Sequence, residues 1–103
     1  MKLIVSEQAQ RQIRQTAQYL QWRNGTGSMR KFIAALHRVQ LLQRKNPKLG
    51  PAEPMLADLQ RSYRSMVVTP YNKIIYCIVD DVIEIADFWD TRLDPSSLVH
   101  EVS

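Results

Sequence analysis

Apolar residues recur every three or four positions in the first half of the chain, which predicts two amphipathic helices. The first set is Ala9, Ile13, Ala17 and Leu20, and the second is Phe32, Ile33, Leu36, Val39 and Leu42. Ser6 is a candidate N-cap for the first helix, and Glu7 suits the positive end of its dipole. This spacing indicates a first helix of about 17 residues.

The segment NGTGS, residues 24–28, is expected to separate the helices, because glycine and small polar residues favour turns. Ser28 is a candidate N-cap for the second helix. Asn46-Pro47 ends that helix, since proline lacks an amide hydrogen and restricts the residue before it. The sequence therefore predicts a helical hairpin over residues 6–46.

After an extended connector rich in proline (Asn46–Pro54), the period of the apolar residues changes to two. Three segments rich in Val, Ile, Tyr, Phe and Trp are predicted to be strands joined by short turns at Thr69-Pro70 and Asp80-Asp81. These segments are residues 62–69, 71–79 and 82–89. With an initial strand at Leu3–Val5, the predicted order is β-α-α-β-β-β. We expect an α+β fold whose helical hairpin packs on one face of a small antiparallel sheet.

A chain of 103 residues with 45% hydrophobic and 23% charged residues is typical of one globular domain, here residues 1–103 with the sheet at about 62–90. No stretch of eighteen apolar residues and no secretory signal is recognised, so no membrane partner is expected. The single cysteine, Cys77, forms no intramolecular disulfide, which suits a reducing compartment. The expected location is the cytoplasm.

Charge is distributed unevenly along the chain. Residues 1–50 contain ten Lys and Arg against Glu7 alone, a balance of +9, while residues 51–103 contain four against nine acids, a balance of −5. A basic first half suggests an acidic protein partner or a nucleic-acid surface, with an ordinary solvated face as the alternative. Arg30 and Arg38 of the predicted second helix are therefore candidate binding residues.

Catalytic and metal-binding motifs find little support. His37 and His100 lie far apart in sequence and in no metal-binding spacing, and Cys77 lies in a predicted strand among apolar neighbours, as a small buried residue would. Gly25 and Gly27 lack the strand and the Lys-Ser/Thr of a phosphate loop. We expect no metal and no cofactor, and a small-molecule enzyme is disfavoured.

Two cations of the predicted strands are candidates for phosphate binding. Strand alternation places Arg64 on a face with Met66 and Val68, and Lys73 on a face with Tyr71, Ile75 and Cys77. If these faces coincide away from the helices, Arg64 and Lys73 form a basic strip, with Arg92 at the end of the sheet. The alternative is ordinary surface charge, with Arg92 paired to Asp90 or Asp94.

The stretch SYRSMVVTPYNKIIYCIVDDVIEIADFWDTRLDP, residues 62–95, together with the order of elements, resembles the RelE/ParE superfamily of toxins from bacterial type II toxin–antitoxin modules. The shared pattern is a strand with aromatic-Arg, a next strand ending in Ile-Ile-Tyr, an Asp-Asp turn, a third strand and a D-x-R-x-D-P ending. The resemblance covers nearly the whole chain in architecture, and its motifs are concentrated in the last third.

The resemblance implies two alternative mechanisms. RelE-type toxins are ribosome-dependent endonucleases that cleave messenger RNA with basic residues and a C-terminal tyrosine or histidine. Arg64, Lys73 and Arg92 match basic positions of that set. In contrast, Met66 stands where a second strand lysine is expected, and Leu98 falls near the position of the tyrosine. Losses of this kind typically cost factors of about 10² to 10³ each in rate. Tyr71 and His100 remain as substitutes.

ParE-type toxins, which bind DNA gyrase, are more similar to this chain in the helical hairpin and in the ending after Phe88 and Trp89. An exposed Trp89 beside Arg92 would suit a protein-binding hot spot, while a buried Trp89 would close the core. The resemblance also implies a cognate antitoxin, which the basic half would attract or an exposed strand edge would bind by strand addition.

Three functional hypotheses follow from the sequence. The chain is a gyrase-binding toxin, a ribosome-dependent messenger-RNA endonuclease, or an inactive member that binds only its partner or nucleic acid. The candidate residues for binding a target or antitoxin are Arg30, Arg38, Arg64, Lys73, Trp89 and Arg92.

Overall fold

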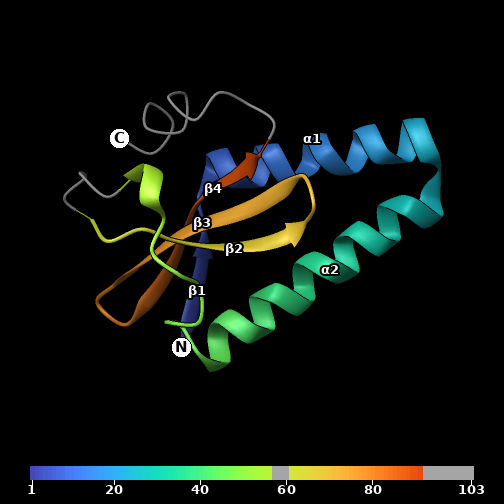
Figure 1. The fold of residues 1–103 in the computed structure, drawn as a ribbon. Helices are drawn as coiled ribbons and strands as arrows, with labels where there is room; N and C mark the ends of the chain where they lie inside the picture. Colours follow the sequence, from blue (N-terminus) through green and yellow to red (C-terminus); the bar gives the residue numbers. More distant parts are fainter. Residues whose placement is uncertain (57–60, 92–103) are drawn as a thin grey trace.

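The computed structural model describes residues 1–56 and 61–91, which form two helices and a four-stranded sheet (Figure 1). The elements are β1 (Lys2–Val5), α1 (Glu7–Asn24), α2 (Thr26–Lys45), the 3₁₀ helix η1 (Pro54–Leu56), β2 (Arg64–Thr69), β3 (Asn72–Val79) and β4 (Val82–Asp90). The predicted α+β class and the order β-α-α-β-β-β are confirmed.

The sheet is mixed, with the strand order β1-β4-β3-β2. Strands β2, β3 and β4 pair antiparallel as predicted, but β1 runs parallel to β4, with Leu3 opposite Ile83. The expectation of a purely antiparallel sheet is therefore wrong for β1. Alternation of apolar residues specifies a strand but not the direction of the strand beside it.

Local signals account for most element boundaries. The Ser6 hydroxyl oxygen accepts a hydrogen bond from the Ala9 amide (3.1 Å) and donates one to the Ala86 carbonyl (2.9 Å), so the predicted N-cap also ties α1 to β4. Gly25 alone, at φ 90°, separates α1 from α2, because glycine adopts this conformation without strain. The prediction that Ser28 caps α2 is wrong, since α2 already begins at Thr26.

The predicted turn between β3 and β4 is confirmed. Val79 pairs with Val82, and Asp80 and Asp81 both have positive φ, at 48° and 62°. Two consecutive residues with positive φ are typical of the type I′ hairpin turn, which aspartate tolerates better than most residues. This turn places β4 beside β3 in the centre of the sheet.

Each face of the sheet carries an apolar cluster. The cluster under the helices contains Ala9, Phe32, Leu36, Val39, Ile74, Tyr76, Ile83, Ile85 and Phe88. The cluster on the opposite face contains Leu56, Tyr63, Ile75, Cys77 and Trp89. The helical hairpin covers only the first face (Figure 1), and Leu56 of η1 reaches the second.

The connector (Asn46–Pro54) joins the two faces by passing around the outer edge of β2. The Ser65 amide donates to the Pro51 carbonyl (3.0 Å), and the Glu53 amide donates to the Tyr63 carbonyl (2.9 Å). On the helix side the Tyr76 hydroxyl donates to the Pro47 carbonyl (2.8 Å) and accepts from the Gly50 amide (3.0 Å). The connector is thus hydrogen-bonded to the sheet along its length.

Gly50 lies so close to the sheet that it has no room for a side chain. A Cβ there would lie 2.5 Å from the Ser65 carbonyl oxygen and 2.7 Å from the Tyr76 hydroxyl, whereas a Cβ at Gly27 meets nothing within 4 Å. We predict that Gly50→Ala lowers the free energy of unfolding by about 1–3 kcal/mol through this clash. Gly27→Ala, inside α2, should leave it unchanged or raise it by up to about 1 kcal/mol. Urea denaturation measures both, and equal stability of the two variants would contradict this packing.

Candidate functional site

Arg64 and Lys73 lie on opposite faces of the sheet. Residues directly opposite each other in an antiparallel pair share a face, and here Arg64 is opposite Tyr76 while Lys73 is opposite Val67 and Trp89. Tyr76 belongs to the cluster under the helices, and Trp89 belongs to the cluster on the other face. The predicted basic strip is therefore wrong, because the register of β2 against β3 separates the two cations.

Arg64 binds the connector. Its Nη1 donates hydrogen bonds to the carbonyl oxygens of Gly50 (2.7 Å) and Lys48 (3.2 Å). A hydrogen bond from a charged donor to a carbonyl oxygen is stronger than one between two neutral groups. In this arrangement the guanidinium stabilises the path of the chain before β2.

Lys73 binds the connector from the opposite face. Its Nζ lies 2.7 Å from Oε2 of Glu53, and the two side chains are 20% and 2% exposed. A buried carboxylate needs a counter-charge, because burial away from water strongly disfavours an isolated ion. The ion pair therefore holds Glu53 in place, and the Lys73 charge is neutralised inside the protein.

Trp89 is 3% exposed and packs in the cluster with Leu56, Tyr63, Ile75 and Cys77. The alternative in which Trp89 closes the core is thus confirmed, and Trp89 is not available as an exposed hot spot. Arg92, Leu98 and His100 lie outside the described residues. Tyr71, in the turn between β2 and β3, is 55% exposed.

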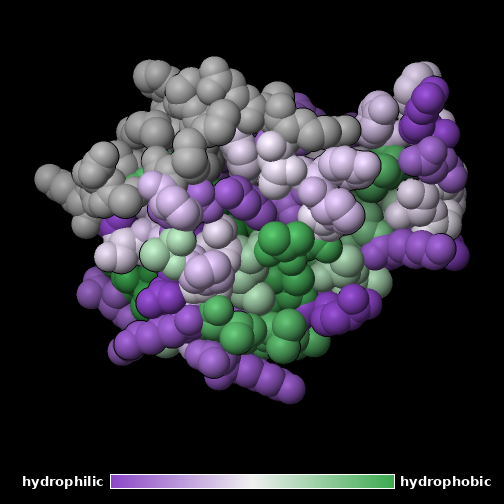
Figure 2. Space-filling model, in the orientation of Figure 1, coloured by the Kyte–Doolittle hydropathy of each residue, from purple (hydrophilic) through white to green (hydrophobic). Residues whose placement is uncertain are grey.

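The cations of the helical hairpin point to solvent. Arg30, Arg38 and His37 are all exposed on α2. In the described part of the chain, the ion pairs are Lys73–Glu53 and Arg61–Glu84, so none of the basic residues in 1–50 is paired there. The hairpin surface visible in Figure 2 mixes hydrophilic with apolar side chains, and Leu41 and Leu42 of α2 are among its exposed apolar residues.

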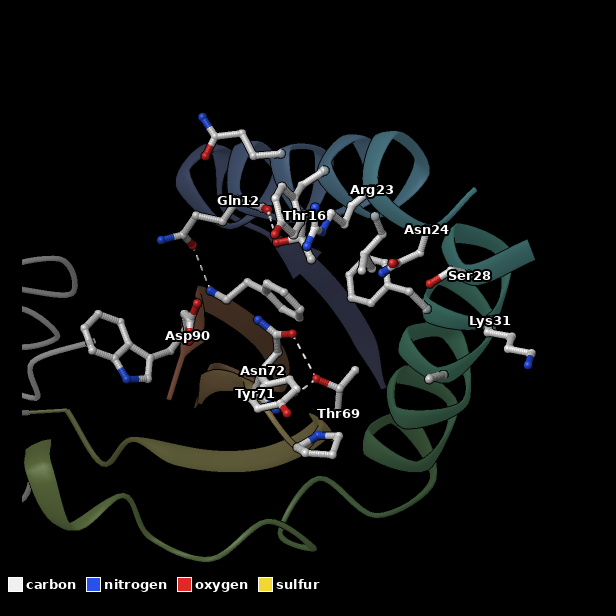
Figure 3. Close-up of a pocket in the computed structure, with 18 residues that line it drawn as sticks. Gln12, Thr16, Arg23, Asn24, Ser28, Lys31, Thr69, Tyr71, Asn72 and Asp90 are labelled. Atoms are coloured by element: carbon white, nitrogen blue, oxygen red, sulfur yellow. Dashed lines mark hydrogen bonds between the residues drawn. The ribbon is translucent and has the colours of Figure 1, made fainter. Parts of the chain in front are cut away.

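A groove of about 910 Å³ opens between the helical hairpin and the β2–β3 turn (Figure 3). Its rim includes Tyr19, Arg23 and Lys31 from the hairpin and Tyr71 from the turn, and its floor includes Phe32 and Phe88. Sequence reasoning missed this groove. The sequence held one indication of an exposed binding surface, because Tyr19 is aromatic but lies outside the apolar stripe of α1.

The β2–β3 turn that borders the groove is fixed by hydrogen bonds. The Thr69 hydroxyl donates to Oδ1 of Asn72 (2.9 Å) and accepts from the Tyr71 amide (3.1 Å), and the Thr91 amide donates to the Tyr71 carbonyl (2.8 Å). On the helix side, Oε1 of Gln12 accepts from the Phe88 amide (2.9 Å). The aromatic ring of Tyr71 is therefore presented from a rigid turn.

Neither a metal-binding cluster nor an exposed thiol occurs among the described residues. No group of three or more His, Cys, Asp or Glu among them is placed to hold a metal ion. Cys77 is 1% exposed, and burial, followed by the nearby Glu84 carboxylate, raises the pKa of its thiol, which disfavours the reactive thiolate.

Comparisons with known proteins identify the fold. No protein-family model and no curated protein matches the chain. Several solved structures are similar to it. Among them are a YoeB dimer from Staphylococcus aureus (20% identity, covering 86% of this chain and 94% of that one, TM-score 0.61) and a YoeB/ParE toxin from Agrobacterium tumefaciens (16% identity, covering 87% and 98%, TM-score 0.61). A YoeB–YefM complex from Staphylococcus aureus is also similar (20% identity, covering 86% and 94%, TM-score 0.55). The chain has the fold of these YoeB and YoeB/ParE proteins, which confirms the predicted RelE/ParE-like architecture.

If Lys73 is a structural residue, its removal should destabilise the fold. We predict that Lys73→Met lowers the free energy of unfolding at pH 7 by about 3 kcal/mol, because it leaves the Glu53 carboxylate buried without its counter-charge. The matched control is Arg61→Met, which removes the exposed Arg61–Glu84 pair (53% and 38% exposed) and should change little. Urea denaturation measures the free energy of unfolding of both variants. A Lys73→Met protein as stable as the parent would refute the structural role of Lys73.

Burial of Cys77 predicts a loss of stability in alkali. The pKa of this thiol is raised above its ordinary value of 9.0, so the stability that it contributes is complete below pH 9.0 and is lost as pH rises through the folded-state pKa. As the pH rises above 9.0 the free energy of unfolding should therefore fall, and Cys77→Ala should flatten that slope. Urea denaturation over this range measures the slope, and identical slopes would contradict the prediction.

Proposed function

We propose that this chain is the toxin of a type II toxin–antitoxin module, that it acts by binding its cellular target, and that a cognate antitoxin neutralises it. The YoeB/ParE fold supports the toxin assignment. The similarity to a YoeB–YefM complex supports a protein partner, because a chain of this fold is found there with a second protein.

One observation favours binding over catalysis: Arg64 and Lys73 lie on opposite faces of the sheet, and each is engaged with the connector. A nuclease needs its charge-stabilising groups around one phosphate. Within the residues that the structure describes, these two cations do not meet that requirement. The proposed target is DNA gyrase, as in the ParE-like hypothesis.

The alternative is a RelE-like, ribosome-dependent messenger-RNA endonuclease. The fold likeness supports it equally, because the RelE/ParE resemblance includes both kinds of toxin. In this mechanism Arg92, with Tyr71 or His100, would carry the chemistry in place of the Arg64 and Lys73 pair. A third hypothesis, an inactive member that binds only its partner, predicts no effect on growth.

The proposed location is the cytoplasm, where gyrase and ribosomes are found. Neither helix in the described part of the chain is long and apolar enough to cross a membrane. The proposal includes no cofactor and no metal.

Controlled expression in a bacterium tests the proposal. Growth, pulse-labelled protein synthesis and plasmid supercoiling are followed in one culture, with a vector that carries an early stop codon as the control. We predict arrested growth with an early loss of supercoiling while translation continues. Early translation arrest with cleaved messenger RNA would replace gyrase by the ribosome as the target. Normal growth with full-length protein present would refute the toxin assignment.

A further inference from the structure

Two exposed aromatic residues, Tyr19 and Tyr71, line the groove, and a third, Trp22, lies beside Tyr19 on α1. Trp22 is 78% exposed, Tyr19 is 56% exposed and Tyr71 is 55% exposed. The rings of Tyr19 and Trp22 lie 6.2 Å apart between centroids, so they form one aromatic surface on α1. We call these three residues with Arg23 and Lys31 the aromatic–basic surface.

The residue types of this surface are those that dominate protein interfaces. Trp, Tyr and Arg are the residues most enriched among interface hot spots, because they bury large areas with few rotatable bonds. The groove beside them has an apolar floor that includes Leu20, Phe32 and Phe88. A partner side chain of matching size, aliphatic or aromatic, would find an apolar pocket there.

The charge of this region favours an acidic partner. Arg23 and Lys31 both line the groove. Asp90 is the acidic residue among the described residues that line the groove, and it interacts with another group. The hairpin that presents Arg23 and Lys31 belongs to the half of the chain with a charge of +9. Charge complementarity of this kind directs association and selects partners.

Strand addition at the sheet edges is less well supported. The outer edge of β2 is partly occupied, because Ala52 bridges to Arg64 and the Ser65 amide already donates to Pro51. The opposite edge is β1, which has four residues. An edge of this length offers few main-chain hydrogen bonds to a partner strand.

We infer that the aromatic–basic surface is the docking site for an acidic segment of a partner protein, which inserts one large apolar side chain into the groove. The inference rests on the proposed function only in that a protein partner exists. The acidic residues of the segment lie near Arg23 and Lys31, and its apolar residue contacts the aromatic rings.

The test uses the full-length chain labelled with ¹⁵N and a defined probe, a synthetic peptide of glutamates around a central Leu-Trp pair. We expect the Trp22 indole signal and the amide signals of Arg23 and Tyr71 to move on titration. Trp22→Ala should weaken binding roughly tenfold, and so should the double variant Arg23→Glu/Lys31→Glu.

Matched control variants lie on the other half of α2, away from the groove. Leu41→Ala removes a large apolar side chain that is 58% exposed, and Arg44→Glu/Lys45→Glu makes the same change in charge as the groove variant. Both controls should bind the peptide as the parent does. If the control variants weaken peptide binding as much as the groove variants do, the peptide binds to positive charge anywhere on the helices. That result would overturn the inference.

Three further outcomes also overturn it: no binding of the peptide, shifts confined to β1, or shifts at the surface with a thymidine oligonucleotide but not with the peptide. The growth experiment is independent of this one. A chain that arrests growth but does not bind the peptide refutes the docking site alone. A chain that binds the peptide but leaves growth unchanged refutes the toxin assignment alone.

Discussion

Tyr76 lies with its ring fully buried under the helices and its hydroxyl bonded to two groups of the connector, Pro47 and Gly50. Arg64 holds the same segment through two carbonyls, and Lys73 holds it from the other face through Glu53. Because the connector is bound at both faces, it passes closely around the edge of β2. Leu56 is thereby carried to the second face, where it packs with Trp89.

This constraint decides which charges are available for function. Arg64 and Lys73 are used inside the molecule, so they do not form one phosphate-binding site. The cations of the helical hairpin, such as Arg23 and Lys31, remain unpaired within the described part of the chain and lie beside exposed aromatic rings. The binding function proposed above would use this surface directly. A nuclease with the same fold would have to draw its catalytic groups from elsewhere.

The sequence predicted those features that depend on neighbouring residues. Ser6 caps α1, the apolar periods give the helices and strands, and Asp80-Asp81 forms the β3–β4 turn. Features that depend on register were not predicted. A shift of one residue moves a side chain to the other face, so the faces of Arg64 and Lys73 follow from the pairing of β2 with β3.

The groove was also beyond sequence reasoning, because it joins α1, α2 and a turn that lies far from them in the chain. Tyr19 and Trp22 are spaced as neighbours on a helix. Only the fold brings Tyr71 to the same groove as Tyr19. The exposure of Trp89 also depended on the fold. The sequence left open whether Trp89 is exposed or buried, and the packing of Leu56 and Tyr63 in the same cluster explains its burial.

The most direct test of this account is growth inhibition by the double variant Glu53→Gln/Lys73→Met, which removes both charges of the buried pair without leaving either alone. Circular dichroism first establishes that the variant is folded. If Lys73 acts only through the connector, the folded variant inhibits growth as the parent does. A folded variant that no longer inhibits growth would contradict the account, because the Lys73 charge would then be needed for the activity itself.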